Sequence, residues 1–134
     1  MAEPRALVVG TAEGVVLVLG EPLGFWGGLD PATGTIVDVH HPQAGANVAG
    51  RVLVMPGGRG SSSSSSVFAE AVRAGTAPTA VVLREPDPIL ALGSIVAREL
   101  YGRAVPVVVA DDPLEDGRLV VVDADDRGVR LSPA

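Results

Sequence analysis

The chain alternates short aliphatic runs with glycine, proline and aspartate breaks, and this alternation restricts it to a sheet-rich fold. Each run has the length and the β-branched composition of a single strand. The predicted strands span residues 6–9, 15–19, 35–39, 51–55, 79–83, 105–109, 119–122 and 129–131. No run approaches the roughly 20 apolar residues of a membrane-spanning helix. We therefore expect a soluble cytoplasmic protein with no membrane contact.

Two segments in the middle third of the chain predict helices instead. Residues 65–74 (SSVFAEAVRA) are amphipathic, and residues 88–100 place Ile89, Leu92 and Leu100 at helical spacing. Asp87 is the expected N-cap of the second helix, with Pro88 at its first position. Many strands with few helices favour a mixed α/β domain in which a barrel-like sheet carries the helices. At 134 residues, 47% of them hydrophobic, we expect one domain over residues 1–134.

The charge and cysteine content exclude several classes of partner and cofactor site. The formal net charge is -6, with ten arginines and no lysine. A nucleic-acid surface needs clustered positive charge, so we expect no nucleic-acid partner. Cysteine is absent. The chain therefore forms no disulfide and supplies no thiolate to zinc or to an iron–sulfur cluster.

The stretch MPGGRGSSSSSS, residues 55–66, is the one low-complexity segment. Serine-rich tracts are often flexible linkers. Here a strand-like run (51–55) precedes the stretch and an amphipathic run follows it, and a linker at this place would separate two parts too small to fold alone. The sequence therefore favours an ordered turn inside a strand–turn–helix unit.

Such a turn has the chemistry of an anion site. Gly57, Gly58 and Gly60 let the backbone turn sharply and approach a ligand. The serines fall at the start of a helix, where backbone N–H groups and the helix dipole favour an anion. Arg59 adds a bidentate cationic donor. The same positive field would stabilise a serine alkoxide, so one hypothesis is that a serine of this turn acts as a catalytic base. The alternatives are an anion-binding module without catalysis and a purely structural loop.

The remaining motifs are weaker. A nucleotide-binding loop of the Walker type requires lysine, which is absent. His40 and His41 are adjacent, so in a strand they point to opposite faces, and structural or surface roles are favoured. The aspartates of DDPLEDG and DADDRG predict hairpin turns. Phe25 and Trp26 form either a packed aromatic anchor, the lip of a pocket or a contact with another subunit.

Three blocks of the sequence, covering roughly residues 10 to 109, carry a family resemblance. They are PLGFWGGLDPATGTIVDVHHP, GRVLVMPGGRGSSSSSSVFAEAVRAGTAPTAVV and LGSIVARELYGRAVPVV. Their order and spacing resemble the small subunit of the aconitase X family. The resemblance implies the swivelling β/β/α domain of aconitases. It also implies a large-subunit partner, and an iron–sulfur cluster whose cysteines lie on that partner and not on this chain.

The resemblance also implies a reaction and a set of site residues. Family members are dehydratases of small anionic substrates, either cis-3-hydroxy-L-proline or mevalonate 5-phosphate. The serine directly after Gly-Arg-Gly, Ser61, is implied as the catalytic base, and the partner's cluster as the Lewis acid for the leaving hydroxyl. The implied substrate-binding residues are Arg59, Gly60, Ser62 and Ser63. No metal ligand is expected on the chain itself.

The sequence departs from the family pattern at two places, and the first bears on the substrate. The unbroken serine run differs from the Ser-Thr-Val-Gly-Ser usual in the archaeal enzymes, which favours cis-3-hydroxy-L-proline. Gly24 stands where serine is expected before Phe-Trp-Gly-Gly. We further expect Ser64, Ser65 and Ser66 to start the helix. Closure against a large subunit predicts exposed apolar surface near Phe25 and Trp26 and around the serine turn.

Overall fold

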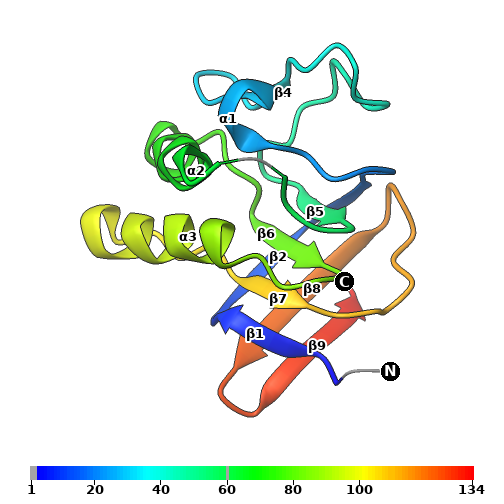
Figure 1. Cartoon of the computed structure of the whole chain (residues 1–134). Helices are drawn as coiled ribbons and strands as arrows, with labels where there is room; N and C mark the ends of the chain where they lie inside the picture. Colours follow the sequence, from blue (N-terminus) through cyan, green and yellow to red (C-terminus); the bar gives the residue numbers. More distant parts are fainter. Residues whose placement is uncertain (1–2, 60) are drawn as a thin grey trace.

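The computed structural model describes residues 3–59 and 61–134, and within them a mixed sheet of seven strands forms the body of the molecule (Figure 1). The strands are β1 (Arg5–Val8), β2 (Gly10–Val18), β5 (Val52–Met55), β6 (Ala80–Leu83), β7 (Val107–Val109), β8 (Leu119–Asp125) and β9 (Gly128–Pro133), in the spatial order β1-β7-β6-β5-β2-β8-β9. β1 also lies against β8 and β9, so the sheet curls almost into a closed barrel. The predicted mixed α/β fold with a barrel-like sheet is confirmed.

Helices cover one side of this sheet, on the left in Figure 1. α2 (Ser63–Ala74) and α3 (Pro88–Tyr101) pack against each other, and α1 (Phe25–Gly28) is a short kinked turn that packs on α2. A second, two-stranded sheet pairs β3 (Leu29–Asp30) with β4 (Thr35–Ile36). In the described part of the chain, no helix is both long and apolar enough to cross a membrane.

The central strands β5, β6 and β7 are buried on both faces because the sheet curls around one core while the helices cover another. Successive residues of β5 alternate between the two cores: Leu53 and Met55 face the helices, and Val52 and Val54 face the inside of the curled sheet. All four residues are buried. Strands enclosed in this way are continuous aliphatic runs, which is why the sequence shows them so clearly.

The parallel strands determine where a site can form. β2, β5, β6 and β7 are mutually parallel neighbours, so their carboxyl ends lie at one edge of the sheet. The loops after β2, β5 and β6 leave from this edge, and two of them lead directly into α2 and α3. Ligand sites in sheets of this kind form outside the carboxyl ends of the strands.

Several predicted element boundaries differ from the structure. The strand predicted at 35–39 ends at Ile36, because the Val37 and Asp38 amides both donate to the Gly28 carbonyl and the chain leaves the ladder. β2 begins at Gly10 rather than at residue 15, because the added residues pair with β8. α2 begins at Ser63, earlier than the predicted Ser64–Ser66 start.

The two aspartate-rich turns have different outcomes. DADDRG is a hairpin turn between β8 and β9, where Asp125 pairs with Gly128, as predicted. DDPLEDG is not a hairpin turn, because it joins β7 to β8 and these strands are separated in the sheet by β6, β5 and β2. It is a crossover whose end is fixed by the Asp116 carboxylate, which accepts the Val18 amide at 2.8 Å.

Candidate functional site

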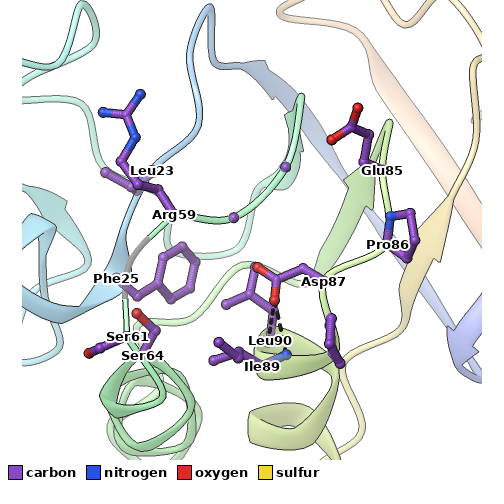
Figure 2. Close-up of a pocket in the computed structure, with 13 residues that line it drawn as sticks. Leu23, Phe25, Arg59, Ser61, Ser64, Glu85, Pro86, Asp87, Ile89 and Leu90 are labelled. Atoms are coloured by element: carbon purple, nitrogen blue, oxygen red, sulfur yellow. Dashed lines mark hydrogen bonds between the residues drawn. The ribbon is translucent and has the colours of Figure 1, made fainter.

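A pocket of about 180 Å³ lies at the carboxyl edge of the parallel strands (Figure 2). Three loops build it: the loop after β2 contributes Leu23 and Phe25, the loop after β5 contributes Arg59 and Ser61, and the loop after β6 contributes Glu85 and Asp87. An isolated parallel bridge between Leu23 and Gly58 ties the first two loops together. The edge expected from sheet topology therefore carries a pocket lined by polar groups.

The apolar wall of the pocket comes from residues that also belong to the core. Leu23, Phe25 and Leu90 are buried and line it. The Phe25 ring lies 5.5 Å from the Phe68 ring, centroid to centroid, with the planes tilted by 52°. Trp26, the next residue, is 64% exposed. Phe25 is thus the anchor and pocket wall, and the expected exposed apolar surface is confirmed at Trp26 and wrong at Phe25.

Two serines one helical turn apart line the pocket. Ser61 is exposed to solvent at the start of the serine turn. Ser64 is 4% exposed, and its hydroxyl accepts the Trp26 amide at 3.2 Å. The Ser64 amide donates to the Ser61 carbonyl at 3.0 Å. From the sequence, Ser64 was predicted only as part of the helix start, although its i, i+3 spacing from Ser61 places both side chains on one face of the turn.

The other predicted site residues of this loop lie differently. The Ser62 and Ser63 side chains are exposed and do not line the pocket. Gly60 lies outside the described residues. Arg59 lines the pocket, and its Nη2 is 3.8 Å from Glu21 Oε1. Both side chains of that pair are more than half exposed, so the contact is weak and leaves the guanidinium able to turn to a ligand.

Two carboxylates, those of Glu85 and Asp87, also line the pocket, and the sequence did not predict them as site residues. Figure 2 shows Glu85 on the side opposite Arg59, with the Asp87 carboxylate below it. Asp87 Oδ1 accepts the amides of Ile89 at 2.9 Å and Leu90 at 3.3 Å, which confirms the predicted N-cap of α3. The pocket therefore combines one cation with two carboxylates.

Glycines allow these loops to approach one another closely. A Cβ at position 58 would lie 1.5 Å from Asp87 Oδ2, whereas a Cβ at position 57 would meet no atom within 4 Å. A Cβ at position 24 would lie 2.7 Å from the Arg59 carbonyl oxygen. Gly24, the departure from the family pattern, thus lies where the loop after β2 touches the loop after β5.

The two histidines do not contribute to the pocket. His41 is 5% exposed; its Nδ1 accepts the Gln43 amide at 3.0 Å, so its Nε2–H donates to the Glu21 carbonyl at 3.2 Å. This neutral ring holds the Glu21 turn in place, which agrees with the structural role favoured by the sequence. The His40 side chain is exposed. Among the described residues, no three histidine, aspartate or glutamate side chains gather as a metal site.

The chain as a whole matches a known family. A family model described as the aconitase X swivel domain matches residues 1–131. The chain belongs to this family. Among solved structures, a chain of the crystal structure of Thermococcus kodakaraensis aconitase X (holo-form) superposes with a TM-score of 0.85 at 37% identity. The match covers 96% of this chain and 95% of that one, which confirms the swivel-domain fold.

Named relatives of this swivel domain fall into two groups. The cis-3-hydroxy-L-proline dehydratase of Pseudomonas aeruginosa is 53% identical over 104 residues, which are 78% of this chain. The phosphomevalonate dehydratase small subunit of Methanothermobacter thermautotrophicus is 40% identical, covering 95% of this chain and 96% of its own length.

The two groups differ in how much of the relative the swivel domain represents. The chain spans 18% of the Pseudomonas aeruginosa dehydratase and 17% of the one from Hypocrea jecorina. It spans nearly the whole of the small subunit from Methanothermobacter thermautotrophicus. Both groups of relatives are named dehydratases.

Proposed function

We propose that this swivel domain is the small subunit of an aconitase X-type dehydratase and that Ser61 is its catalytic base. The observation that carries the proposal is the pocket at the carboxyl edge of β2, β5 and β6, where Ser61 and Arg59 line one side. The match to small subunits over nearly their whole length supports the two-subunit arrangement. In this proposal the large subunit supplies the ligands of the iron–sulfur cluster, which fits a chain without cysteine.

The chain's own residues have defined tasks in this mechanism. Ser61 Oγ, as the alkoxide, takes a proton from the substrate carbon, and the electron pair of that C–H bond forms a carbon–carbon double bond. The hydroxyl departs as hydroxide with the electron pair of the C–O bond, and the proton taken by Ser61 passes to it, which gives water and restores the alkoxide. The start of α2 stabilises negative charge on Ser61 Oγ and on the substrate. Arg59 holds the substrate's anionic group through paired N–H donors. In the proposal the loop amides of Gly60, Ser62 and Ser63 share this task.

The charges of the pocket favour cis-3-hydroxy-L-proline as the substrate. That molecule carries a carboxylate and a ring ammonium, so Arg59 would face the first while Glu85 and Asp87 would face the second. Mevalonate 5-phosphate, the alternative, carries a carboxylate and a phosphate and no cation, so two pocket carboxylates would repel it. The 53% identity to the Pseudomonas aeruginosa enzyme supports the same choice.

The test is an activity assay of this chain together with its large subunit. Each substrate is supplied separately, and loss of water is followed by mass spectrometry. We expect turnover of cis-3-hydroxy-L-proline and none of mevalonate 5-phosphate. Ser61→Ala should lower kcat by about 1,000-fold, the scale of a lost general base. Ser66→Ala, an exposed serine of α2 outside the pocket, is the matched control and should leave kcat unchanged.

Different results would overturn different parts of the proposal. A Ser61→Ala variant that keeps its rate would show that the base is another group. Turnover of mevalonate 5-phosphate alone would assign the other substrate. Tight binding of carboxylates or phosphates by the chain alone, without activity in the presence of the large subunit, would favour a non-catalytic anion-binding module.

A further inference from the structure

α3 differs from an ordinary surface helix because it carries apolar residues on its outer as well as its inner face. Leu90, Ala91 and Ala97 are buried against the core. On the outer face, Leu92 is 53% exposed and Ile95 is 43% exposed. A helix on the surface of a globular domain normally turns polar residues to solvent. The outer face of α3 therefore has the apolar composition of a protein–protein interface.

The neighbouring helix α2 shows the ordinary pattern in the same layer. Its outward residues include Glu70 and Arg73, which pair with each other, and the exposed Ala74. In α3 the only charged residues are Arg98 and Glu99, both in the last turn. The apolar outer face is thus a property of α3 and not of the helical layer as a whole.

The exposed face of α3 forms one wall of an apolar groove. The groove is lined by Leu7 of β1 and by Pro86, Pro88, Ala91, Leu92 and Ile95. Pro86 and Pro88 also line the candidate catalytic pocket. The groove therefore begins at the rim of the pocket and runs away from it along α3.

We propose that this groove is the docking surface for the large subunit of the dehydratase, which inserts apolar side chains between α3 and β1. The inference rests on the proposed function. The chain spans less than a fifth of the single-chain relative from Pseudomonas aeruginosa, so most of a dehydratase lies outside a segment of this size. A subunit that completes the pocket must reach its rim, where Pro86 and Pro88 continue directly into the groove.

Leu92 and Ile95 are the expected anchors of this contact. Both are aliphatic, project from adjacent turns of α3, and are 43% or more exposed in the isolated chain. Burial of apolar side chains of this size is the main favourable term in association. A few central apolar residues commonly contribute most of the binding free energy of an interface.

The experiment measures binding of the purified chain to its purified large subunit by isothermal titration calorimetry. Leu92→Glu should raise the Kd by about 30-fold, the effect of losing a central anchor. Leu100→Glu is the matched control, because Leu100 is 66% exposed on the same helix but does not line the groove. It should change the Kd by about threefold or less, as a peripheral contact does. Thermal unfolding of both variants verifies that they remain folded.

Each outcome bears on a defined part of the inference. Equal Kd values for Leu92→Glu and Leu100→Glu would overturn the docking surface while leaving the proposed function intact. Dimers of the isolated chain that Leu92→Glu dissociates, with unchanged binding of the large subunit, would show that a second copy covers the groove and would also overturn it. Failure of the wild-type chain to bind any large subunit would overturn the proposed function itself.

Discussion

The N-termini of α2 and α3 lie at the same pocket and follow two neighbouring parallel strands, yet they are capped differently. At α3, the Asp87 carboxylate accepts the amides of Ile89 and Leu90. At α2, the N-cap is Ser62, and within the described residues its hydroxyl caps none of the first amides. The first turn of α3 is thus capped by a carboxylate, whereas at α2 the Ser64 and Ser65 amides donate to the Ser61 and Ser62 carbonyls and no carboxylate caps the helix within the described residues. An anion would be repelled by the Asp87 cap at α3 and meets no such charge at the start of α2. The comparison explains why Ser61, rather than a group at α3, lies at the proposed anion site.

The difference originates in the backbone. Asp87 is extended, with φ -130° and ψ 99°, so its side chain folds back over the first turn of α3. Ser62 is already helical, with φ -58° and ψ -21°, which points its side chain away from the amides. Serine and aspartate are both good N-cap residues, so residue type alone does not produce the difference.

Among changes that test the two helix ends, the largest effect is expected from giving the N-terminus of α2 a negative charge like that of α3. Ser62→Asp should lower kcat/KM about 30-fold, because a negative charge near the proposed anion site costs roughly 2 kcal/mol. The same change should raise the free energy of unfolding by about 0.5 kcal/mol through the helix dipole. Ser62→Asn, similar in shape and neutral, should do neither. Steady-state kinetics and urea unfolding measure the two quantities, and an unchanged kcat/KM in Ser62→Asp would argue against an anion at this helix end.

The next largest effect is a loss of stability at the N-terminus of α3, which Asp87 caps. Asp87→Ala should lower the free energy of unfolding by about 1 kcal/mol, because two amides of α3 lose their acceptor. Asp87→Asn keeps an oxygen acceptor and should retain most of the stability. Ser62→Ala, the equivalent change at α2, should leave the free energy of unfolding nearly unchanged, because within the described residues the Ser62 side chain makes no capping hydrogen bond. Equal losses in Asp87→Ala and Ser62→Ala, measured by urea unfolding, would contradict the difference between the two ends.

An effect of similar size is expected where the loop after β5 meets the loop after β6. Gly58→Ala should displace the Asp87 carboxylate and lower the free energy of unfolding by roughly 1 kcal/mol, about as much as loss of the Asp87 cap. Gly57→Ala is the matched control, since a Cβ there meets no atom within 4 Å. In the Asp87→Ala background, Gly58→Ala should cost much less, because the carboxylate that it displaces is gone. Additive losses in this double-mutant cycle, measured by urea unfolding, would show that Gly58 does not act through Asp87.

The smallest effect is expected far from both helix ends. In the β8–β9 hairpin, the Arg130 guanidinium bonded to Asp125 at 2.7 Å lowers the pKa of that carboxylate. Because the pKa of Asp125 is lower in the folded than in the unfolded chain, ionisation of this carboxylate stabilises the fold at pH values above the unfolded-state pKa. This stabilisation is lost as the pH falls through the folded-state pKa. Arg130→Gln should therefore cause a slight loss at pH 7 that disappears in acid, with no change in kcat/KM. Unfolding curves at several pH values test this, and a loss that persists in acid would show another cause.

Much of the fold was accessible from the sequence because the parallel strands are buried on both faces. The runs at 51–55 and 79–83 became β5 and β6 with little change. By contrast, the run 35–39 is also rich in β-branched residues, but it forms only a two-residue strand and Val39 is 81% exposed. Composition identifies residues that suit a strand, whereas a partner strand is needed to make one.

The candidate site was accessible only in part. The glycine-serine turn and Ser61 follow from local pattern, since a strand, glycines and a helix in succession form one βα unit. Ser64 was missed because its partner, the Trp26 amide, is 38 residues away in the sequence. Glu85 and Asp87 were missed as pocket residues because only the pairing of β5 with β6 brings their loop beside Arg59.

The sequence by itself determined the local chemistry of this protein: the βα turn, the Asp87 cap of α3, the DADDRG hairpin turn and the absence of thiolate ligands. These features depend on residues that are adjacent or within one helical turn, so their spacing is sufficient. Tertiary structure decided which aromatic is buried, which serine is hidden, and which charges share the pocket. Those outcomes depend on the packing of distant segments, in which a sheet edge gathers three loops that the sequence keeps apart.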